Sequence, residues 1–88
     1  MEMQENFDLT NFQLDGELLR RVPVELMFRY NFVPLGETSD GRLAIAVADP
    51  AQLLMIYEIS ALLHRRIVTK RSPLRQIEVL LKKIEQGA

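Results

Sequence analysis

The sequence is poor in residues that carry out chemistry. Its 88 residues include no cysteine, one histidine and four glycines. The absence of cysteine excludes disulfides, thiolate metal sites and cysteine nucleophiles, and nothing indicates an oxidising compartment. The glycines lie far apart and none precedes a lysine, which excludes a phosphate-binding P-loop.

The remaining candidates for catalysis are also weak. His64 has no carboxylate in the ten residues that follow it, so a structural role such as helix capping is favoured over acid-base chemistry. Glu37 and Asp40 fall in a predicted hairpin loop, and Asp49 falls at a predicted helix start. We therefore expect no catalytic residue, no metal site and no cofactor. The favoured interpretation is a domain that binds a partner or a ligand. The alternative, an independent enzyme, requires a co-purifying metal or cofactor.

The overall charge is nearly balanced, with 11 lysines and arginines against 12 aspartates and glutamates. This balance gives no general attraction to nucleic acid or to anionic lipid. No apolar run approaches the roughly 20 residues that span a bilayer, and the acidic N-terminus does not resemble a signal peptide. We expect a cytoplasmic protein with no nucleic-acid partner and no direct membrane insertion.

The length fits one hydrophobic core and one domain. Residues 1–15 are predicted to form an acidic, extended N-terminal arm on the domain surface, with Phe7, Leu9, Phe12 and Leu14 scattered through it. Residues 16–85 are predicted to form a single α/β binding domain. Residues 86–88 are interpreted as a C-terminal end or linker.

The pattern of apolar residues and turn signals predicts the element order α-α-β-β-α-β-α. Two short helices before residue 31 are separated at Pro23, which disfavours one continuous helix. Strands are predicted within 32–38 and 42–48, joined by a turn at 39–41, and at 66–70. The fold class is α+β with two layers: a small three-stranded mixed sheet packed by about four helices, its second and third strands parallel.

Three local features sharpen this prediction. Asn31 is expected to end the second helix in the left-handed conformation. The third helix is predicted to start at Asp49-Pro50, with Gln52 in the position of a capping box, and to run to about Leu63. Its apolar residues cover more than half of its circumference, which predicts that it is substantially buried. The last helix begins after Ser72-Pro73.

Charge is distributed unevenly along the chain. The segment between Ile59 and Ile77 holds five basic residues and no acidic one, whereas the first 17 residues hold five acids and no base. We call the five basic residues the basic edge: Arg65, Arg66, Lys70, Arg71 and Arg75. One interpretation is a solvated rim that the acidic arm neutralises. The other is a partner-binding site for an acidic protein surface or a phosphate-bearing ligand, which arginine grips in a bidentate manner.

Four features in a fixed order suggest a family. They are the helix led by Pro23, the strand with Val33-Pro34-Leu35, the turn at Asp40-Gly41, and the small-residue strand that runs into Asp49-Pro50. From about Glu17 to Ile84 the chain resembles the N-terminal domain of type II secretion and type IV pilus assembly ATPases, the general secretory pathway protein E N-terminal domain family.

This resemblance implies a cytoplasmic, non-catalytic module that precedes the ATPase domain of a longer chain. It also implies that the module docks the ATPase onto a platform or adaptor protein at the cytoplasmic face of the inner membrane. Some members of the wider family bind cyclic di-GMP, and a cyclic di-GMP sensing domain is the alternative function. The arginine-leucine-glycine motif used for that purpose is absent, because residues 16–21 have another order, and His64 stands where the family has glycine.

Overall fold

The computed structural model describes residues 6–87. Its elements follow the predicted order α-α-β-β-α-β-α, which confirms the α+β fold class with four helices and a three-stranded sheet in the described part of the chain. Their bounds are α1 Gly16–Arg21, α2 Val24–Tyr30, β1 Val33–Glu37, β2 Leu43–Val47, α3 Leu53–Leu63, β3 Ile67–Arg71 and α4 Leu74–Glu85.

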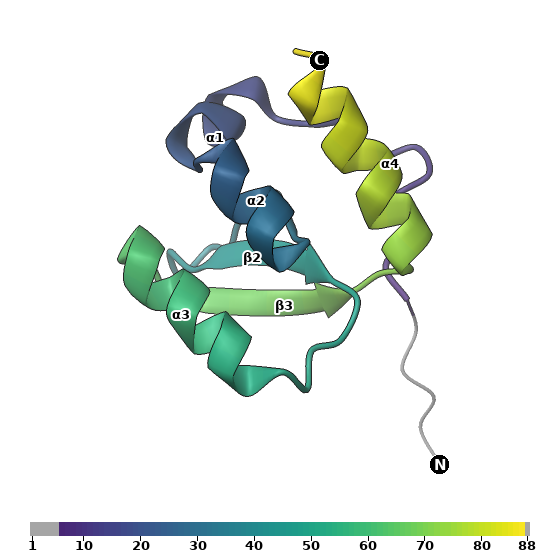
Figure 1. The fold of residues 1–88 in the computed structure, drawn as a ribbon. Helices are drawn as coiled ribbons and strands as arrows, with labels where there is room; N and C mark the ends of the chain where they lie inside the picture. The colour runs from purple at the N-terminus through teal and green to yellow at the C-terminus, as the bar shows by residue number, and fades with distance from the viewer. Residues whose placement is uncertain (1–5, 88) are drawn as a thin grey trace.

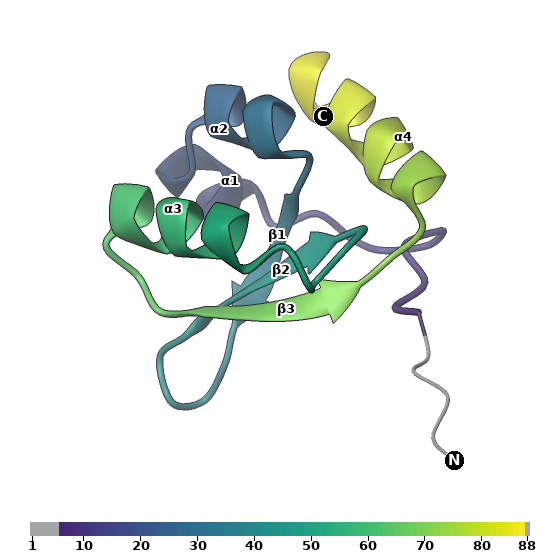
Figure 2. The same ribbon diagram turned by 60° about the horizontal axis from the view of Figure 1, so that its bottom comes forward.

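The sheet is mixed, as predicted, with the strand order β1-β2-β3. β1 pairs antiparallel with β2 and contains an irregularity between Pro34 and Gly36, while β2 pairs in parallel with β3. Proline has no N–H to give to a second neighbour, which suits the position of β1 at a sheet edge. The four helices gather on one side of the strands (Figures 1 and 2).

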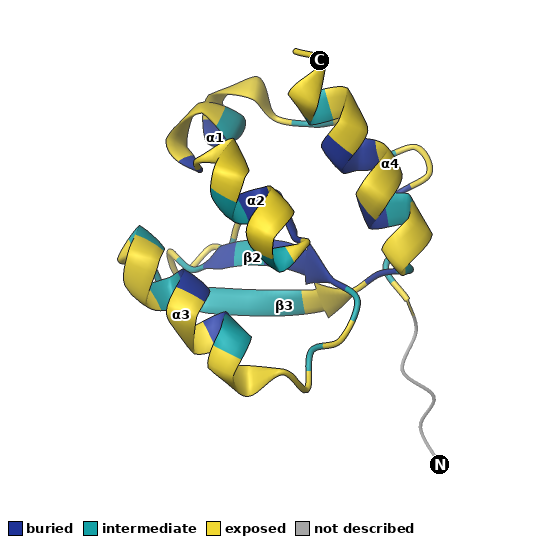
Figure 3. Cartoon of the chain, viewed as in Figure 1, coloured by how far each residue is buried: buried dark blue, intermediate teal, exposed yellow. Residues whose placement is uncertain are grey.

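β2 forms the centre of the hydrophobic core. Four of its five residues are buried, and Ala44 is half-buried. Helix residues that close over the strand include Met27, Ile59 and Ile77, each fully buried. The buried positions therefore concentrate on β2 and on the inner faces of the helices, whereas β3 stays partly exposed (Figure 3).

The described part of the N-terminal arm is held by both packing and hydrogen bonds. Leu9 is 2% exposed and belongs to the core cluster. The Phe7 N–H donates to the Arg71 carbonyl at 2.6 Å, and the Ser72 hydroxyl donates to the Phe7 carbonyl at 2.9 Å. The Leu9 N–H donates to Gln76 Oε1 at 2.8 Å. Residues 6–15 are thus joined to the junction between β3 and α4. Residues 1–5 of the predicted arm, and Ala88, lie outside the described residues.

Two predicted turn geometries are confirmed. Asn31 ends α2 with a φ of 54°, in the left-handed region that asparagine tolerates. The hairpin between β1 and β2 turns at Gly41, whose φ is 87°. A residue with a side chain is strained at this φ, so glycine suits the turn.

The predicted start of the third helix is wrong by about one turn. α3 begins at Leu53, and Gln52 occupies the N-cap position without a side-chain hydrogen bond. Asp49 instead closes a turn before the helix: its Oδ1 accepts the Ala51 N–H at 3.0 Å and its carbonyl accepts the Gln52 N–H at 3.2 Å. Aspartate bonds its own following backbone in such turns, which competes with a helix start.

The predicted burial of that helix is also wrong. Only Ile56 and Ile59 are buried within α3. Leu54 is 80% exposed and Tyr57 is 64% exposed. The sheet has three strands with helices on one side, so α3 packs inward on a single face, and its remaining apolar side chains meet solvent.

Candidate functional site

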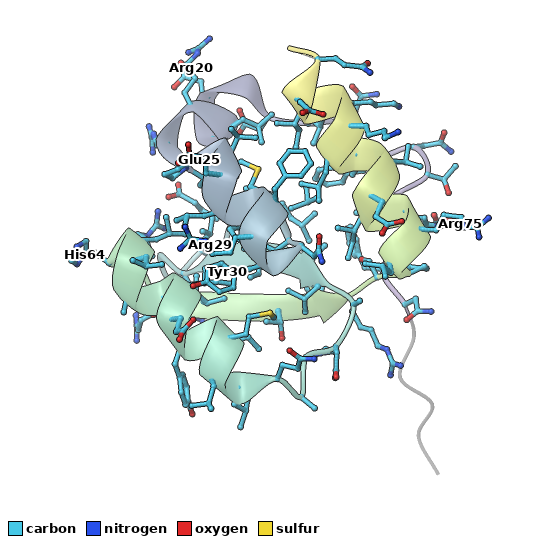
Figure 4. The ribbon with its side chains drawn as sticks, in the orientation of Figure 1. Arg20, Glu25, Arg29, Tyr30, His64 and Arg75 are labelled. Carbon is cyan, nitrogen blue, oxygen red and sulfur yellow. The ribbon has the colours of Figure 1, made fainter. Side chains whose placement is uncertain are left out.

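The basic edge divides into two groups at opposite ends of β3. Arg65 and Arg66 precede the strand, while Lys70 and Arg71 are its last two residues and Arg75 lies in the first turn of α4. A parallel strand rises about 3.3 Å per residue, so Arg66 and Lys70 are about 13 Å apart along the chain. Figure 4 shows Arg75 and His64, the neighbour of Arg65, pointing outward at opposite sides of the domain.

Arg65 differs from the other members because the fold already uses its guanidinium. Its Nη2 atom lies 2.8 Å from Glu37 Oε2 and 3.0 Å from the Gly41 carbonyl oxygen. Its side chain is only 29% exposed. Arg65 therefore ties the loop between α3 and β3 to the hairpin of β1 and β2, which lowers its availability to a partner.

The other four members are exposed to solvent. Arg66, Lys70, Arg71 and Arg75 form no ion pair within residues 6–87. The two acids in the described part of the arm are engaged locally: Asp8 accepts from the Thr10 N–H at 2.9 Å, and Asp15 caps α1. Glu2 and Glu5 lie outside the described residues. The described acids of the arm thus leave these four cations available.

Three of the four available cations are anchored at one corner, and Lys70 and Arg71, as neighbours in a strand, point to opposite faces of the sheet. Lys70 and Arg71 lie at the end of β3, and Arg75 follows across the short connection into α4. The main chain of this corner is fixed, because the Ser72 N–H donates to the Val47 carbonyl at 2.9 Å and the Phe7 N–H bonds to Arg71. A fixed backbone with exposed cationic side chains suits an acidic surface, because the side chains adapt while their anchor points hold.

The candidate catalytic groups are engaged in the fold. His64 is the C-cap of α3 with a φ of 57°, which confirms the predicted capping position, and its N–H bonds to the Ser60 carbonyl. Asp40 accepts from the Thr38 hydroxyl and from Arg42 within the hairpin. The Thr38 hydroxyl, followed by Arg42, lowers the pKa of Asp40 below its ordinary value. In residues 6–87 no group of three metal-ligating side chains comes together.

Several clefts flank the helices. One of about 190 Å³ lies between the end of α2 and the start of α3, among residues such as Tyr30, Asp49 and Met55. A second of about 200 Å³ has Leu18 and Leu43 in its lining and the cations Arg21 and Arg65 beside them. Both are smaller than the roughly 300–1,000 Å³ of small-molecule sites. Two more open hollows fall within that range: one of about 430 Å³ along residues 51–55 and one of about 420 Å³ between α1 and the end of α4.

The comparison with known families decides the identity of the domain. The model of the MshEN domain matches residues 2–88. The chain belongs to the MshEN domain family. MshEN domains are N-terminal domains of secretion and pilus ATPases, and they are regulatory rather than catalytic parts of those proteins. The predicted resemblance is therefore confirmed.

A solved structure described as "Structure of MshE with cdg" shares the fold. The TM-score is 0.77 at 21% sequence identity, and the match covers 91% of this chain and 58% of that one. This MshEN domain thus spans little more than half of the MshE chain that it matches. No curated protein matches the sequence. Within residues 6–87, no helix is long and apolar enough to cross a membrane.

The exposed apolar face of α3 was missed by reasoning from the sequence. Four of its large apolar residues are at least half exposed: Leu53, Leu54, Tyr57 and Leu62. The pattern itself held the signal, because an 11-residue helix with apolar residues on every side has more apolar surface than one contact face covers. This surface is a second candidate for contact with a partner.

Proposed function

We propose that this MshEN domain recruits a secretion or pilus assembly ATPase to a platform protein at the cytoplasmic face of the inner membrane. The observation that carries the proposal is the corner of Lys70, Arg71 and Arg75, where three exposed cations form no ion pair within the described chain. Family membership supports a regulatory module attached to a downstream ATPase domain. The binding partner is expected to present carboxylates to this corner.

The test is a binding measurement with charge-reversed variants. K70E/R71E/R75E is expected to weaken binding to the cytoplasmic region of the platform protein by at least tenfold, because each attraction becomes a repulsion. Arg65 is left unchanged, because its replacement breaks the ion pair with Glu37. A loss of folding stability would then be mistaken for a loss of binding.

A matched control keeps the same change in net charge elsewhere. R20E/K82E/K83E reverses three exposed cations on α1 and the last turn of α4. This control is expected to retain binding. Equal affinity of all three proteins would remove the corner of Lys70, Arg71 and Arg75 from the interface, and absence of binding by the unaltered domain would contradict the docking function itself.

The alternative function is cyclic di-GMP sensing. It is favoured by one observation, that the similar structure of MshE is described with cdg. Against it stand the missing arginine-leucine-glycine motif and the small size of the cleft beside Arg21 and Arg65. Calorimetric titration with cyclic di-GMP separates the two functions, since stoichiometric binding at micromolar concentration would favour sensing.

A further inference from the structure

β3 is an edge strand of the sheet, and its outer side is open in the described part of the chain. The strand order β1-β2-β3 gives it one neighbouring strand, β2, and Figure 1 shows it as the outermost strand beside β2. Three of its five residues are half-buried and the last two are exposed. We call the side of β3 that faces away from β2 the open edge.

The backbone groups on the open edge follow from two hydrogen bonds to β2. At the start of β3 the Leu43 N–H donates to the Arg66 carbonyl at 2.8 Å, and at its end the Ser72 N–H donates to the Val47 carbonyl at 2.9 Å. Successive residues of a strand turn their backbone groups to alternate sides, so the even-numbered residues bond to β2. The residues whose N–H and C=O groups point to the open edge are Ile67, Thr69 and Arg71.

One hydrogen bond already forms on the open edge. The Phe7 N–H donates to the Arg71 carbonyl at 2.6 Å, as expected for a group that points outward. Within residues 6–87, the other outward groups are the N–H groups of all three residues and the carbonyls of Ile67 and Thr69, and they form no backbone hydrogen bond. An edge with such donors and acceptors is a template for another extended chain.

The opposite edge of the sheet is protected against such pairing. Pro34 in β1 has no N–H group, and the register of β1 is irregular between Pro34 and Gly36. β3 has neither feature. Its first three residues, Ile67, Val68 and Thr69, are β-branched and favour an extended strand. Pairing with a further strand is therefore expected at β3 and not at β1.

The charges at the end of β3 indicate the shape of the partner. Lys70 and Arg71 are neighbours in the strand, so their side chains point to opposite faces of the sheet. A flat acidic surface on one face meets only one of them. A strand added along the open edge also alternates its side chains, so two adjacent carboxylates meet one cation each. Both cations are exposed and form no ion pair within residues 6–87.

We propose that the open edge of β3 binds an extended acidic segment of the partner protein, which joins the sheet as a fourth strand. The proposal rests on the docking function above and specifies how the partner is bound. Main-chain hydrogen bonds to Ile67 and Thr69 recognise an extended chain. Two adjacent carboxylates in that chain bind Lys70 and Arg71 from the two faces of the sheet, which selects an acidic segment.

A second copy of this chain fits the open edge less well. Parallel pairing of two β3 strands sets Lys70 and Arg71 beside the same residues of the other copy. Antiparallel pairing centred on Thr69 brings Arg66 of each copy close to Lys70 of the other. Like charges on neighbouring strands are destabilising in both arrangements. An acidic segment avoids this repulsion.

The first experiment is a nuclear magnetic resonance titration of the ¹⁵N-labelled chain with two synthetic peptides of roughly eight residues. Both contain threonine, valine and two glutamates. The glutamates are adjacent in one peptide and separated by one residue in the other, where they share a face. The peptide with adjacent glutamates is expected to bind saturably, with shifts along β3, and roughly threefold more tightly than its isomer. Absence of saturable binding, or shifts that avoid β3, would overturn the proposal.

N-methylation of the peptide tests the main-chain hydrogen bonds without altering the protein. Two versions of the adjacent-glutamate peptide are methylated at alternate backbone nitrogens, one at odd and one at even positions. A paired strand points only one of these sets at β3, so one version is expected to bind at least about tenfold more weakly and the other nearly as the parent does. Equal affinity of the two versions would contradict strand addition.

Charge reversal tests the acidic character of the segment. K70E/R71E is expected to weaken binding of the adjacent-glutamate peptide about tenfold, because both cross-strand attractions become repulsions. The control K82E/K83E makes the same change in net charge in the last turn of α4 and is expected to leave binding unchanged. Equal affinity of the two variants would show that Lys70 and Arg71 do not select the segment.

Hydrogen exchange of the complex with the platform protein separates the two proposals. Strand addition is expected to slow exchange of the Ile67, Thr69 and Arg71 amides, which point to the open edge. If the platform protein binds and these amides are unaffected, the edge proposal fails and the docking function stands. If the platform protein does not bind, the docking function fails, and the peptide titration still decides the edge proposal.

The same amides test the rival occupants in the free domain. Protection of Ile67 and Thr69 that rises with the concentration of the domain would overturn the proposal in favour of a second copy. Protection that removal of residues 1–5 abolishes would overturn it in favour of the chain's own N-terminal segment. Fast exchange of both amides at all concentrations is the result expected for an edge that awaits a partner.

Discussion

α3 and α4 have nearly the same length, 11 and 12 residues, and lie on the same side of the sheet, yet they distribute apolar side chains differently. α4 buries Ile77, Leu80 and Leu81, and its outward positions are largely charged. α3 buries two residues and exposes four large apolar ones. The difference shows that the residues of α4 account for its own packing, whereas α3 carries apolar surface that this fold does not use.

The largest expected effect tests whether the buried faces of α3 and α4 contribute equally to stability. Ile59 in α3 and Ile77 in α4 are both fully buried. Ile59→Ala and Ile77→Ala should each lower the free energy of unfolding by about 3 kcal/mol, because each leaves a cavity in a packed core. Urea denaturation followed by circular dichroism measures both. A loss below about 1 kcal/mol for Ile59→Ala alone would show that α3 is loosely packed on its inner side as well.

The next largest expected effect is a loss of stability at the start of α4. The start of α4 is joined to the arm through Ser72, which is 1% exposed and whose hydroxyl donates to the Phe7 carbonyl. Ser72→Ala should cost about 1–2 kcal/mol of stability and increase hydrogen exchange at the Leu9 amide, since a partly buried acceptor loses its donor. The exchange rates of α3 amides serve as the internal control. Equal acceleration in both helices would indicate global rather than local loosening.

A smaller effect concerns how the helices end. α3 ends at His64 with a φ of 57°, whereas the chain after α4 turns at Gly87 with a φ of 84°. A side chain is disfavoured in the left-handed region, so His64→Gly should stabilise the domain by about 0.5–1 kcal/mol. Thermal melting checks the direction. A lower melting temperature would reveal an unrecognised contact of the imidazole.

The smallest expected effect is that the contact between the arm and the start of α4 loses stability at acid pH. Hydrogen bonds from Thr10, first its side chain and then its backbone, lower the pKa of Asp8 in the folded chain, and Gln76 of α4 adds to this. A lowered folded pKa contributes stability that is present above the ordinary value of 3.8 and is lost as the pH falls through the folded pKa. Asp8→Asn should reduce the loss of amide protection in the arm as the pH falls. Amide resonances recorded over the acid range measure this loss. An unchanged pH profile in Asp8→Asn would assign the effect to another group.

The sequence predicted the fold well wherever local signals were strong. Pro23 separates α1 from α2, Asn31 ends α2, and Gly41 turns the hairpin, as expected. The start of α3 was missed because Asp49 can cap a helix or close its own turn, and local sequence does not distinguish the two.

The candidate site was less predictable. The basic edge was visible as a cluster in sequence, but only the folded chain shows that Arg65 is held by Glu37, 28 positions earlier. The partly exposed state of α3 was missed for a related reason. The apolar composition of a helix sets how much surface it is able to bury. The elements that pack around the helix decide how much of that surface is buried.

By itself the sequence determined the element order, the absence of cysteine chemistry and the resemblance to a secretion ATPase domain, because propensities, turn residues and spacing act locally. Tertiary structure alone decided that Leu9 of the arm enters the core, that one of five clustered cations is already paired, and that α3 keeps an apolar face in solvent. These properties depend on contacts between segments far apart in the chain, and no local pattern specifies which segments meet.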